Sequence, residues 1–404
     1  MHLSETAVHL ATTGCEISID SRALCLGTES CDPHTIRLGW LPALSADQCG
    51  GMYNVVYFQD LRATGAATTD IKSALGCCLL KLDRGVYSVI RRCKDSSHRR
   101  FVRFAIDEAW LVYHETGRHR ERSQRRKYLE HLDRLRILHY PRYRSGDVVW
   151  GPSAAKLHKL GLFDVPTQPV NVAHAVSSSR TGSLTRRRIS VHAEDICEVE
   201  GIRVTTQAKT ALDLRMALGP AAAFAAMEQV LRWSMIGIDE EAIFKTGYPP
   251  HIMSRVPDAV DGLFGPPIAR MARGNQSARK LASLVTPLSE SYAESRASFN
   301  LHLLGLHDFV QQFDVKDGYR TITRLDHLFE ESGVALYIDG TQKYVDGGFA
   351  VMNKESWQQN RLLSMGYKVI RFKFNEILNV ATFSRKLFDQ APELRQHCKK
   401  KLAL

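Results

Sequence analysis

Short apolar runs separated by polar turns mark the last quarter of the chain, where two consecutive strands are predicted. The run Thr323–Phe329 is strand-like in composition, residues 330–333 form a polar turn, and a second apolar run covers Val334–Ile338. Two such runs joined by a tight turn predict a β-hairpin. Because a hairpin aligns its two strands, we expect Asp326 and Asp339 at one edge of a sheet.

The region from Tyr53 to Ile90 shows a different pattern, with short helical segments followed by another hairpin. The predicted elements are, in order, a helix over Val56–Leu61, a turn at Thr64–Gly65, a helix capped by Thr68 or Thr69 and ending at Leu75, and a hairpin over Leu79–Val89. This order predicts a winged helix-turn-helix, whose second helix enters the major groove while the hairpin touches phosphates. A small helical unit with a purely structural role is the alternative.

The centre of the chain alternates helical and strand-like patterns. Phe101–Tyr140 is Pro-free with leucines at near-helical spacing, which predicts one basic helical connector. We expect a strand at Arg186–Val191, a second strand at Ile202–Thr205, and a helix capped by Thr206. The Pro- and Gly-rich residues 248–267 predict a linker, followed by an amphipathic helix carrying Arg270, Arg273, Arg279 and Lys280.

These patterns predict an α/β (α+β) multidomain protein, with seven segments. They are an extension poor in regular structure (1–51), the winged helix (52–92), the connector (93–140), a middle domain (141–247), a linker and helix (248–284), a C-terminal domain with a mixed sheet and flanking helices (285–392), and a tail (393–404).

Composition narrows the class of protein. The chain has 404 residues, 44% of them hydrophobic and 24% charged, and no apolar run approaches the roughly 20 residues of a membrane span. The first twenty residues lack the features of a secretory signal. Nine cysteines are scattered without a CxxC pair, so we expect a reducing cytoplasm and neither a disulfide framework nor a zinc ribbon. No nucleotide-binding loop, zinc-protease or serine-hydrolase motif occurs.

The net charge of +11 is unevenly distributed. Residues 91–144 hold 16 Lys and Arg against 7 Asp and Glu, whereas residues 1–50 hold two Arg against six acidic residues. A positive field beside a predicted winged helix indicates double-stranded DNA as a partner. A solvated helix face is the alternative explanation. The candidate phosphate contacts are Lys72, Lys81, Arg84, Arg91 and Arg92.

The candidate chemistry lies in the C-terminal hairpin. Asp326 and Asp339 are predicted at one sheet edge, with Lys343 just beyond them. Two carboxylates that bind Mg²⁺ (or Mn²⁺) and one ammonium that stabilises phosphate charge are what metal-assisted phosphodiester hydrolysis requires. Ordinary turn chemistry for the two aspartates and a solvated role for the lysine are the alternative.

This hairpin resembles the PD-(D/E)xK nuclease superfamily, and within it the Vsr-like branch. The resemblance rests on Asp326, Asp339–Gly340, Lys343–Tyr344, the opening segment Ser289–Arg296, and the closing segment with Glu355, Arg361 and Gly366–Arg371. It implies a restriction-endonuclease-like fold, an Mg²⁺-dependent DNA endonuclease, and Glu294 as an additional catalytic residue. Tyr337 stands where the family usually places a Glu, and a phenol is a poor Mg²⁺ ligand.

The middle and N-terminal segments resemble AbiEi-type antitoxins. The matching runs are Gly85–Tyr87 in the predicted hairpin, Ser153–His158, and Gly201–Asp213, where Lys209 replaces the usual Arg. The resemblance implies a cognate nucleotidyltransferase toxin as a partner. It also keeps open an alternative function, a non-catalytic antitoxin or transcriptional autorepressor with a degenerate nuclease fold. His158 and His192 are interpreted as packing or surface residues.

Overall fold

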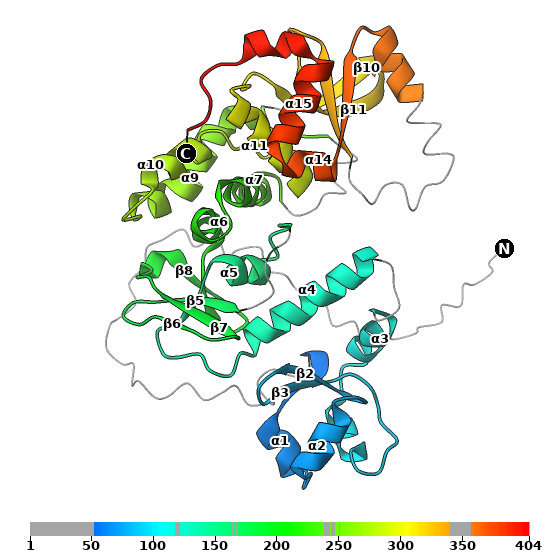
Figure 1. Ribbon diagram of the computed structural model, residues 1–404, viewed down its shortest axis with the longest axis vertical. Helices are drawn as coiled ribbons and strands as arrows, with labels where there is room; N and C mark the ends of the chain where they lie inside the picture. The colour runs from blue at the N-terminus through cyan, green and yellow to red at the C-terminus, as the bar shows by residue number, and fades with distance from the viewer. Residues whose placement is uncertain are drawn as a thin grey trace, which may run out of the picture. The chain divides into compact units, whose positions relative to one another are not determined.

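The computed structural model describes residues 52–117, 122–163, 165, 169–237, 243, 247–249, 251–339 and 357–403. Over these residues the chain is a mixed α/β protein with three sheets, which confirms the predicted α/β class (Figure 1). The predicted extension over residues 1–51 lies outside the described residues. No helix in the described ranges has the length and apolar character needed to cross a membrane.

The N-terminal region contains a three-stranded antiparallel sheet and two short helices. Its elements are η1 (Met52–Asn54), β1 (Val55–Tyr57), α1 (Phe58–Ala63), α2 (Thr68–Ala74), β2 (Leu79–Asp83) and β3 (Val86–Val89). The strands lie in the order β1-β3-β2. The β2–β3 hairpin is confirmed, and Gly85 takes a φ of 78° in its turn, a conformation that favours glycine.

Two details of this region were predicted wrongly. The first residues of the expected helix Val56–Leu61 form strand β1, because Val55–Tyr57 pair with β3 and Val56 is buried in the core. Helix α2 is capped by Ala67, and neither Thr68 nor Thr69 is its N-cap. The Asp70 carboxylate accepts a hydrogen bond from the Ala67 amide (2.9 Å), which satisfies that end of the helix.

The predicted basic helical connector over Phe101–Tyr140 is helical in most of its described residues but is not one continuous helix. It is divided into η2 (Arg99–Phe104), α3 (Glu108–Gly117) and α4 (Arg122–Leu138). The chain bends before α3 because the Asn54 side-chain oxygen accepts hydrogen bonds from the amides of Ile106 (2.9 Å) and Asp107 (2.7 Å). Asp107 in turn accepts a bond from the Trp110 amide. Arg118 to Arg120, part of the predicted basic cluster, lie outside the described residues.

The middle region is built around a six-stranded mixed sheet. Its strands, in the order β6-β7-β5-β4-β9-β8, are β4 (Val148–Val149), β5 (Val170–His174), β6 (Ser179–Arg180), β7 (Leu184–Arg188), β8 (Ile196–Val199) and β9 (Ile202–Thr205). The strand expected at Arg186–Val191 is β7, which begins and ends earlier. Helix α5 (Gly151–Leu157) and 3-10 helix η3 (Ala193–Asp195) complete the set.

The corner between β9 and helix α6 (Gln207–Ala217) forms as predicted. The Thr206 side chain accepts a hydrogen bond from the Lys209 amide (3.3 Å) and is the N-cap. Thr210 donates its hydroxyl to the Thr205 carbonyl oxygen (3.0 Å), which joins strand and helix. Asp213 instead pairs with Lys209 one turn earlier. These residues have a structural role at the corner.

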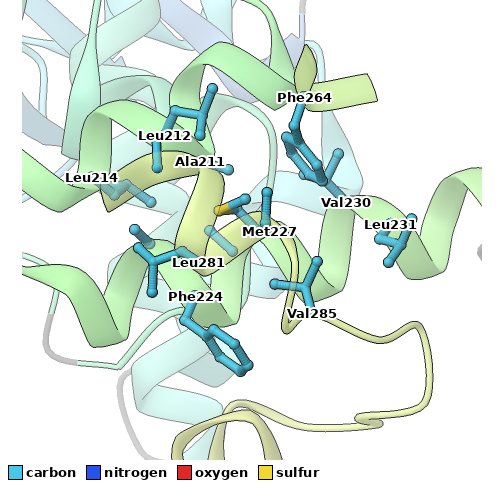
Figure 2. Packing of buried hydrophobic residues seen from close by; sticks show 14 of the residues in the cluster. Ala211, Leu212, Leu214, Phe224, Met227, Val230, Leu231, Phe264, Leu281 and Val285 are labelled. Atoms are coloured by element: carbon cyan, nitrogen blue, oxygen red, sulfur yellow. The ribbon is translucent and has the colours of Figure 1, made fainter. Parts of the chain in front are cut away.

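A helical core follows the sheet. Helix α7 (Pro220–Ile236) packs with α6, α9 (Val256–Ala269) and α10 (Asn275–Ala282), and η4 (Ile252–Arg255) packs against α9. Figure 2 shows the buried side chains that converge here, among them Phe224, Met227, Phe264 and Leu281.

The predicted linker over residues 248–267 is therefore wrong for most of its length. Apolar Phe264 and Ile268 anchor α9 in the core, and Pro266 and Pro267 occupy its last turns. Of the basic residues expected on the next helix, Arg279 and Lys280 lie on α10. Arg270 instead caps α9 and Arg273 precedes α10.

The C-terminal region contains a four-stranded mixed sheet with flanking helices, as predicted. Its elements are α11 (Tyr292–Leu304), β10 (Val310–Asp317), β11 (Arg320–Phe329), β12 (Val334–Asp339), a helix over residues 357–364, β13 (Lys368–Lys373), α14 (Phe374–Leu378), α15 (Val380–Gln390) and η5 (Pro392–His397). Strands β10, β11 and β12 are antiparallel, and β13 is parallel to β12. Residues of α11 and α15 share one core with β12 and β13.

One ion pair of the middle sheet is almost fully buried. The Arg186 guanidinium donates to both carboxylate oxygens of Asp147, at 2.7 and 2.6 Å, and both side chains are 2% exposed. A buried pair adds little by itself, but loss of one member leaves an uncompensated charge in the interior. The pair therefore makes the middle sheet sensitive to substitution at either position.

We expect Asp147→Ala to lower the free energy of unfolding by about 3–5 kcal/mol, because Arg186 stays buried without a counter-charge. Urea denaturation of the full chain measures the change. The matched control is Asp317→Ala, which removes an exposed ion pair with Arg361 and is expected to cost less than about 1 kcal/mol. Equal effects of the two substitutions would contradict this account.

Candidate functional site

The first candidate residue, Glu294, is fixed at the start of α11. The N-cap Ser291 accepts a hydrogen bond from the Glu294 amide (3.3 Å). The Glu294 carboxylate accepts bonds from the Ser291 hydroxyl (2.7 Å) and from the Glu290 amide (2.9 Å). This is a reciprocal capping arrangement, which stabilises the helix start and holds the carboxylate in one orientation.

Asp326 lies where the pairing between β11 and β12 ends. The ladder joins residues 327–329 to residues 334–336. Beyond it the Asp326 Oδ2 atom accepts a hydrogen bond from the Ile338 amide (2.6 Å), so a side chain replaces the next backbone partner. On the other side of β11, Gln312 has a φ of 53° and interrupts the pairing with β10. The strand is irregular on both sides of Asp326.

Glu294 and Asp326 influence each other electrostatically. Poor solvation and the negative charge of Asp326 together raise the pKa of Glu294 to about 8, despite the hydrogen bonds that Glu294 accepts. The Gln312 side-chain amide donates to Glu294 Oε2 at 2.8 Å and so approaches the same carboxylate. Two carboxyl groups brought together in a poorly solvated position are a suitable set of oxygen ligands for a divalent cation.

Asp339 has a different environment. It is the last residue of β12, and the Arg371 guanidinium of the adjacent strand β13 donates to both of its carboxylate oxygens, at 3.2 and 3.0 Å. The same guanidinium lies 5.0 Å from the Tyr337 ring centre. The Tyr337 hydroxyl is hydrogen-bonded to Thr323 (2.7 Å). Asp339 is thus compensated by an arginine, and Lys343 lies outside the described residues.

Sequence reasoning missed the roles of Gln312 and Arg371. Gln312 has no recognisable motif, since its contact depends on a backbone irregularity. Arg371 belongs to the closing segment of the nuclease resemblance, but its partner follows only from the parallel register of β12 and β13, in which Tyr337 lies opposite Arg371. A parallel pairing between strands separated by a helix is hard to predict from sequence.

The candidate phosphate contacts of the N-terminal region fall into two groups. Lys72 on α2, Lys81 on β2 and Arg84 in the hairpin turn are exposed and, within the described residues, form no salt bridge. Arg91 and Arg92 are exposed too, but Arg91 donates to the Cys77 sulfur (2.8 Å) and Arg92 pairs with Glu108. Lys72, Lys81 and Arg84 are therefore the better candidates for contacts with DNA phosphates.

Comparisons with known proteins do not assign this chain to a family. No family model matches this sequence, and neither the curated proteins nor the solved structures include a significant match.

The raised pKa of Glu294 predicts a pH-dependent stability. The unfolded chain releases this proton near pH 4.3, whereas the folded chain keeps it until about pH 8. The group therefore stabilises the fold at low pH, and this contribution is lost as the pH rises through that interval. We expect Glu294→Gln to make the fall in unfolding free energy between pH 5 and pH 8 smaller.

Urea denaturation at pH 5, 6.5 and 8 tests this expectation. The matched control is Glu330→Gln, a substitution of an exposed glutamate in the β11–β12 turn, which should leave the pH profile as in the parent chain. A Glu294→Gln profile that superimposes on that of the control would contradict the raised pKa.

Proposed function

We propose that this chain is a DNA-binding protein whose C-terminal region is a Vsr-like, Mg²⁺-dependent DNA endonuclease. The observation that carries the proposal is the hydrogen bond to the Glu294 carboxylate from Gln312 (2.8 Å), which lies opposite Asp326 in the pairing of β10 with β11; the charge of Asp326 correspondingly raises the Glu294 pKa. Each carboxylate is oriented by backbone amides, of Glu290 and Ile338 respectively. Mutual repulsion of this kind is relieved when a divalent cation binds both groups.

In the proposed reaction, Glu294 and Asp326 would hold the cation, and Asp339, which accepts hydrogen bonds from Arg371, would be a third ligand. A bound Mg²⁺ or Mn²⁺ supplies Lewis-acid polarisation of the phosphate and a lowered pKa of its water. The carboxylates are fixed before the ion arrives, so little reorganisation is required. Lys343, from the nuclease resemblance, is assigned to stabilise charge on the phosphate.

In this proposal, the N-terminal region binds the DNA. Helices α1 and α2 are followed by the β2–β3 hairpin, an order that supports a winged helix-turn-helix. On α2 the side chains of Thr69, Lys72 and Ser73 are exposed and can hydrogen-bond to DNA. Lys81 and Arg84 on the hairpin are suited to phosphate contacts.

A second candidate function is favoured by the Asp339–Arg371 pair. An arginine that compensates one of the predicted metal ligands, beside Tyr337 in place of a glutamate, would suit a nuclease fold that has lost catalysis. The chain would then act as an AbiEi-like antitoxin or autorepressor, with a nucleotidyltransferase toxin as its partner. Both functions share DNA binding and differ in phosphodiester cleavage.

Plasmid cleavage separates the two functions. With Mg²⁺ or Mn²⁺, we expect the purified chain to nick supercoiled DNA, and Asp326→Asn and Glu294→Gln to lower the rate at least about 100-fold, because each removes a proposed ligand. The matched control, Asp317→Asn, changes an exposed aspartate on β10 and should retain the parent rate. DNA affinity is measured in parallel and should change less than about twofold in all three variants.

Metal-dependent nicking that survives both ligand substitutions would refute the proposed site. Tight DNA binding with no nicking by the parent chain would instead identify the antitoxin-like function.

The salt dependence of binding tests the DNA-binding surface. We expect Lys72→Ala, Lys81→Ala and Arg84→Ala each to reduce the slope of log affinity against log salt by roughly 1, because each lost phosphate contact releases one counterion fewer. Fluorescence anisotropy with duplex DNA gives the slopes. The control is Arg188→Ala, which removes an exposed charge of β7 in the middle region. Unchanged slopes in the three variants would rule out this surface.

A further inference from the structure

Three cysteines and a histidine from the two sides of the β2–β3 hairpin converge in the N-terminal region. The group consists of Cys77, Cys78, Cys93 and His98, and their potential ligand atoms all lie within 4.8 Å of one another. Cys77 and Cys78 lie between α2 and β2, Cys93 follows β3, and His98 precedes η2. The folding of the hairpin brings these segments together.

We propose that Cys77, Cys78, Cys93 and His98 form a structural Zn²⁺ site. Structural zinc sites are tetrahedral, and a Cys₃His set is one of their usual ligand combinations. Zn–S bonds of about 2.3 Å place two sulfur ligands about 3.8 Å apart. The Cys77 and Cys93 sulfurs are 3.4 Å apart, and the Cys78 sulfur is 3.3 Å from His98 Nδ1. Small adjustments would give a tetrahedron.

A second observation supports a metal. The other ring nitrogen of His98, Nε2, faces the Asp95 carboxylate at 3.6 Å. Asp95 is itself oriented by hydrogen bonds from the Ser97 amide (2.8 Å) and hydroxyl (2.6 Å). A carboxylate that accepts a hydrogen bond from a zinc-binding histidine fixes its tautomer and raises its basicity, an arrangement common around zinc. Asp95 at 3.6 Å is within ion-pair range of His98 and would complete this hydrogen bond by a shift of about 0.5 Å.

The charged residue beside the cluster also suits a bound Zn²⁺ ion. Three thiolates and one Zn²⁺ have a net charge of −1, and Arg91 donates to the Cys77 sulfur at 2.8 Å. Cys78, Cys93 and His98 are buried and Cys77 is half-buried, which suits an ion that stabilises structure. Buried cysteines can also be simple core residues, but a buried histidine with an oriented carboxylate and an arginine directed at sulfur are not features of an apolar core.

The proposed ion would join the end of α2 to both ends of the hairpin. The core of this region is small, with Cys78 and Cys93 among its members. Small cores commonly require a metal or a disulfide for stability. Zinc at this position would therefore fix the helix proposed to contact DNA, and the inference is independent of the nuclease chemistry.

Metal analysis of the full chain, expressed without added metal and purified under reducing conditions, tests the site. We expect about one zinc per chain by mass spectrometry of the metal, and a loss of at least about tenfold in zinc affinity in Cys93→Ser and His98→Ala. Cys197→Ser, in β8 of the middle region, is the matched control and should retain the ion. After Co²⁺ exchange, the parent and the control should show a sulfur-to-cobalt charge-transfer band, and Cys93→Ser, which removes one thiolate, should show a weaker one.

Asp95→Asn keeps the result interpretable if the ligand variants fail to fold. It leaves all four ligands in place, and we expect a 10–100-fold weaker Zn²⁺ affinity with an unchanged circular dichroism spectrum. The proposal is overturned if the reduced parent chain binds no zinc, if it contains a Cys77–Cys93 disulfide instead, or if both ligand variants bind zinc with the affinity of the parent. The last result would place the ion on other cysteines of the chain.

Discussion

The repulsion between Glu294 and Asp326 is the constraint on which the proposed chemistry of the C-terminal region depends. The two carboxyl groups are oriented by the backbone amides of Glu290, just before α11, and of Ile338 in β12, and the pKa of Glu294 is raised to about 8. A site that is unfavourable for two negative charges is favourable for an ion that compensates both. Asp326 lies where the pairing of β11 with β12 ends and opposite Gln312 of β10, which has a left-handed backbone conformation.

The two proposed metal sites have different ligand atoms, and each set matches the ion proposed for it. Carboxylate oxygens near α11 suit a hard cation such as Mg²⁺, whereas the thiolates and imidazole between α2 and η2 suit Zn²⁺. The first set is oriented but strained by like charges, which fits an ion that takes part in a reaction. The second set is buried and supported by Asp95 and Arg91, which fits an ion that stabilises structure.

Local patterns predicted much of the fold. The hairpins at β2–β3 and β11–β12 and the Thr206 cap follow from apolar runs and turn residues, and these were correct. Contacts between distant residues caused the errors. Asn54 bends the chain ahead of α3, pairing with β3 turns Val56 into strand, and burial of Phe264 makes a helix of a proline-rich segment.

The candidate sites show the same difference between local sequence patterns, which could be predicted, and contacts made only by folding, which could not. The nuclease resemblance selected Asp326, Asp339 and Glu294 from sequence. It did not reveal that Glu294 and Asp326 interact while Asp339 pairs with Arg371. The second contact depends on the parallel register of β12 and β13, and the first on how α11 lies against the sheet. The cysteine cluster has no short spacing motif, since the β2–β3 hairpin separates its members, and only the folded chain unites them.

Tyr248 gives the C-terminal region a physical connection to the helices before it. Its ring lies 5.5 Å from the Arg232 guanidinium of α7 and 5.3 Å from that of Arg324 in β11, and its hydroxyl donates to Glu290 (2.6 Å). Glu290 is the residue whose amide holds Glu294. A fragment starting at residue 285 would lose both Arg232 and Tyr248, so the carboxylate pair belongs to a larger cooperative unit than the nuclease-like segment alone.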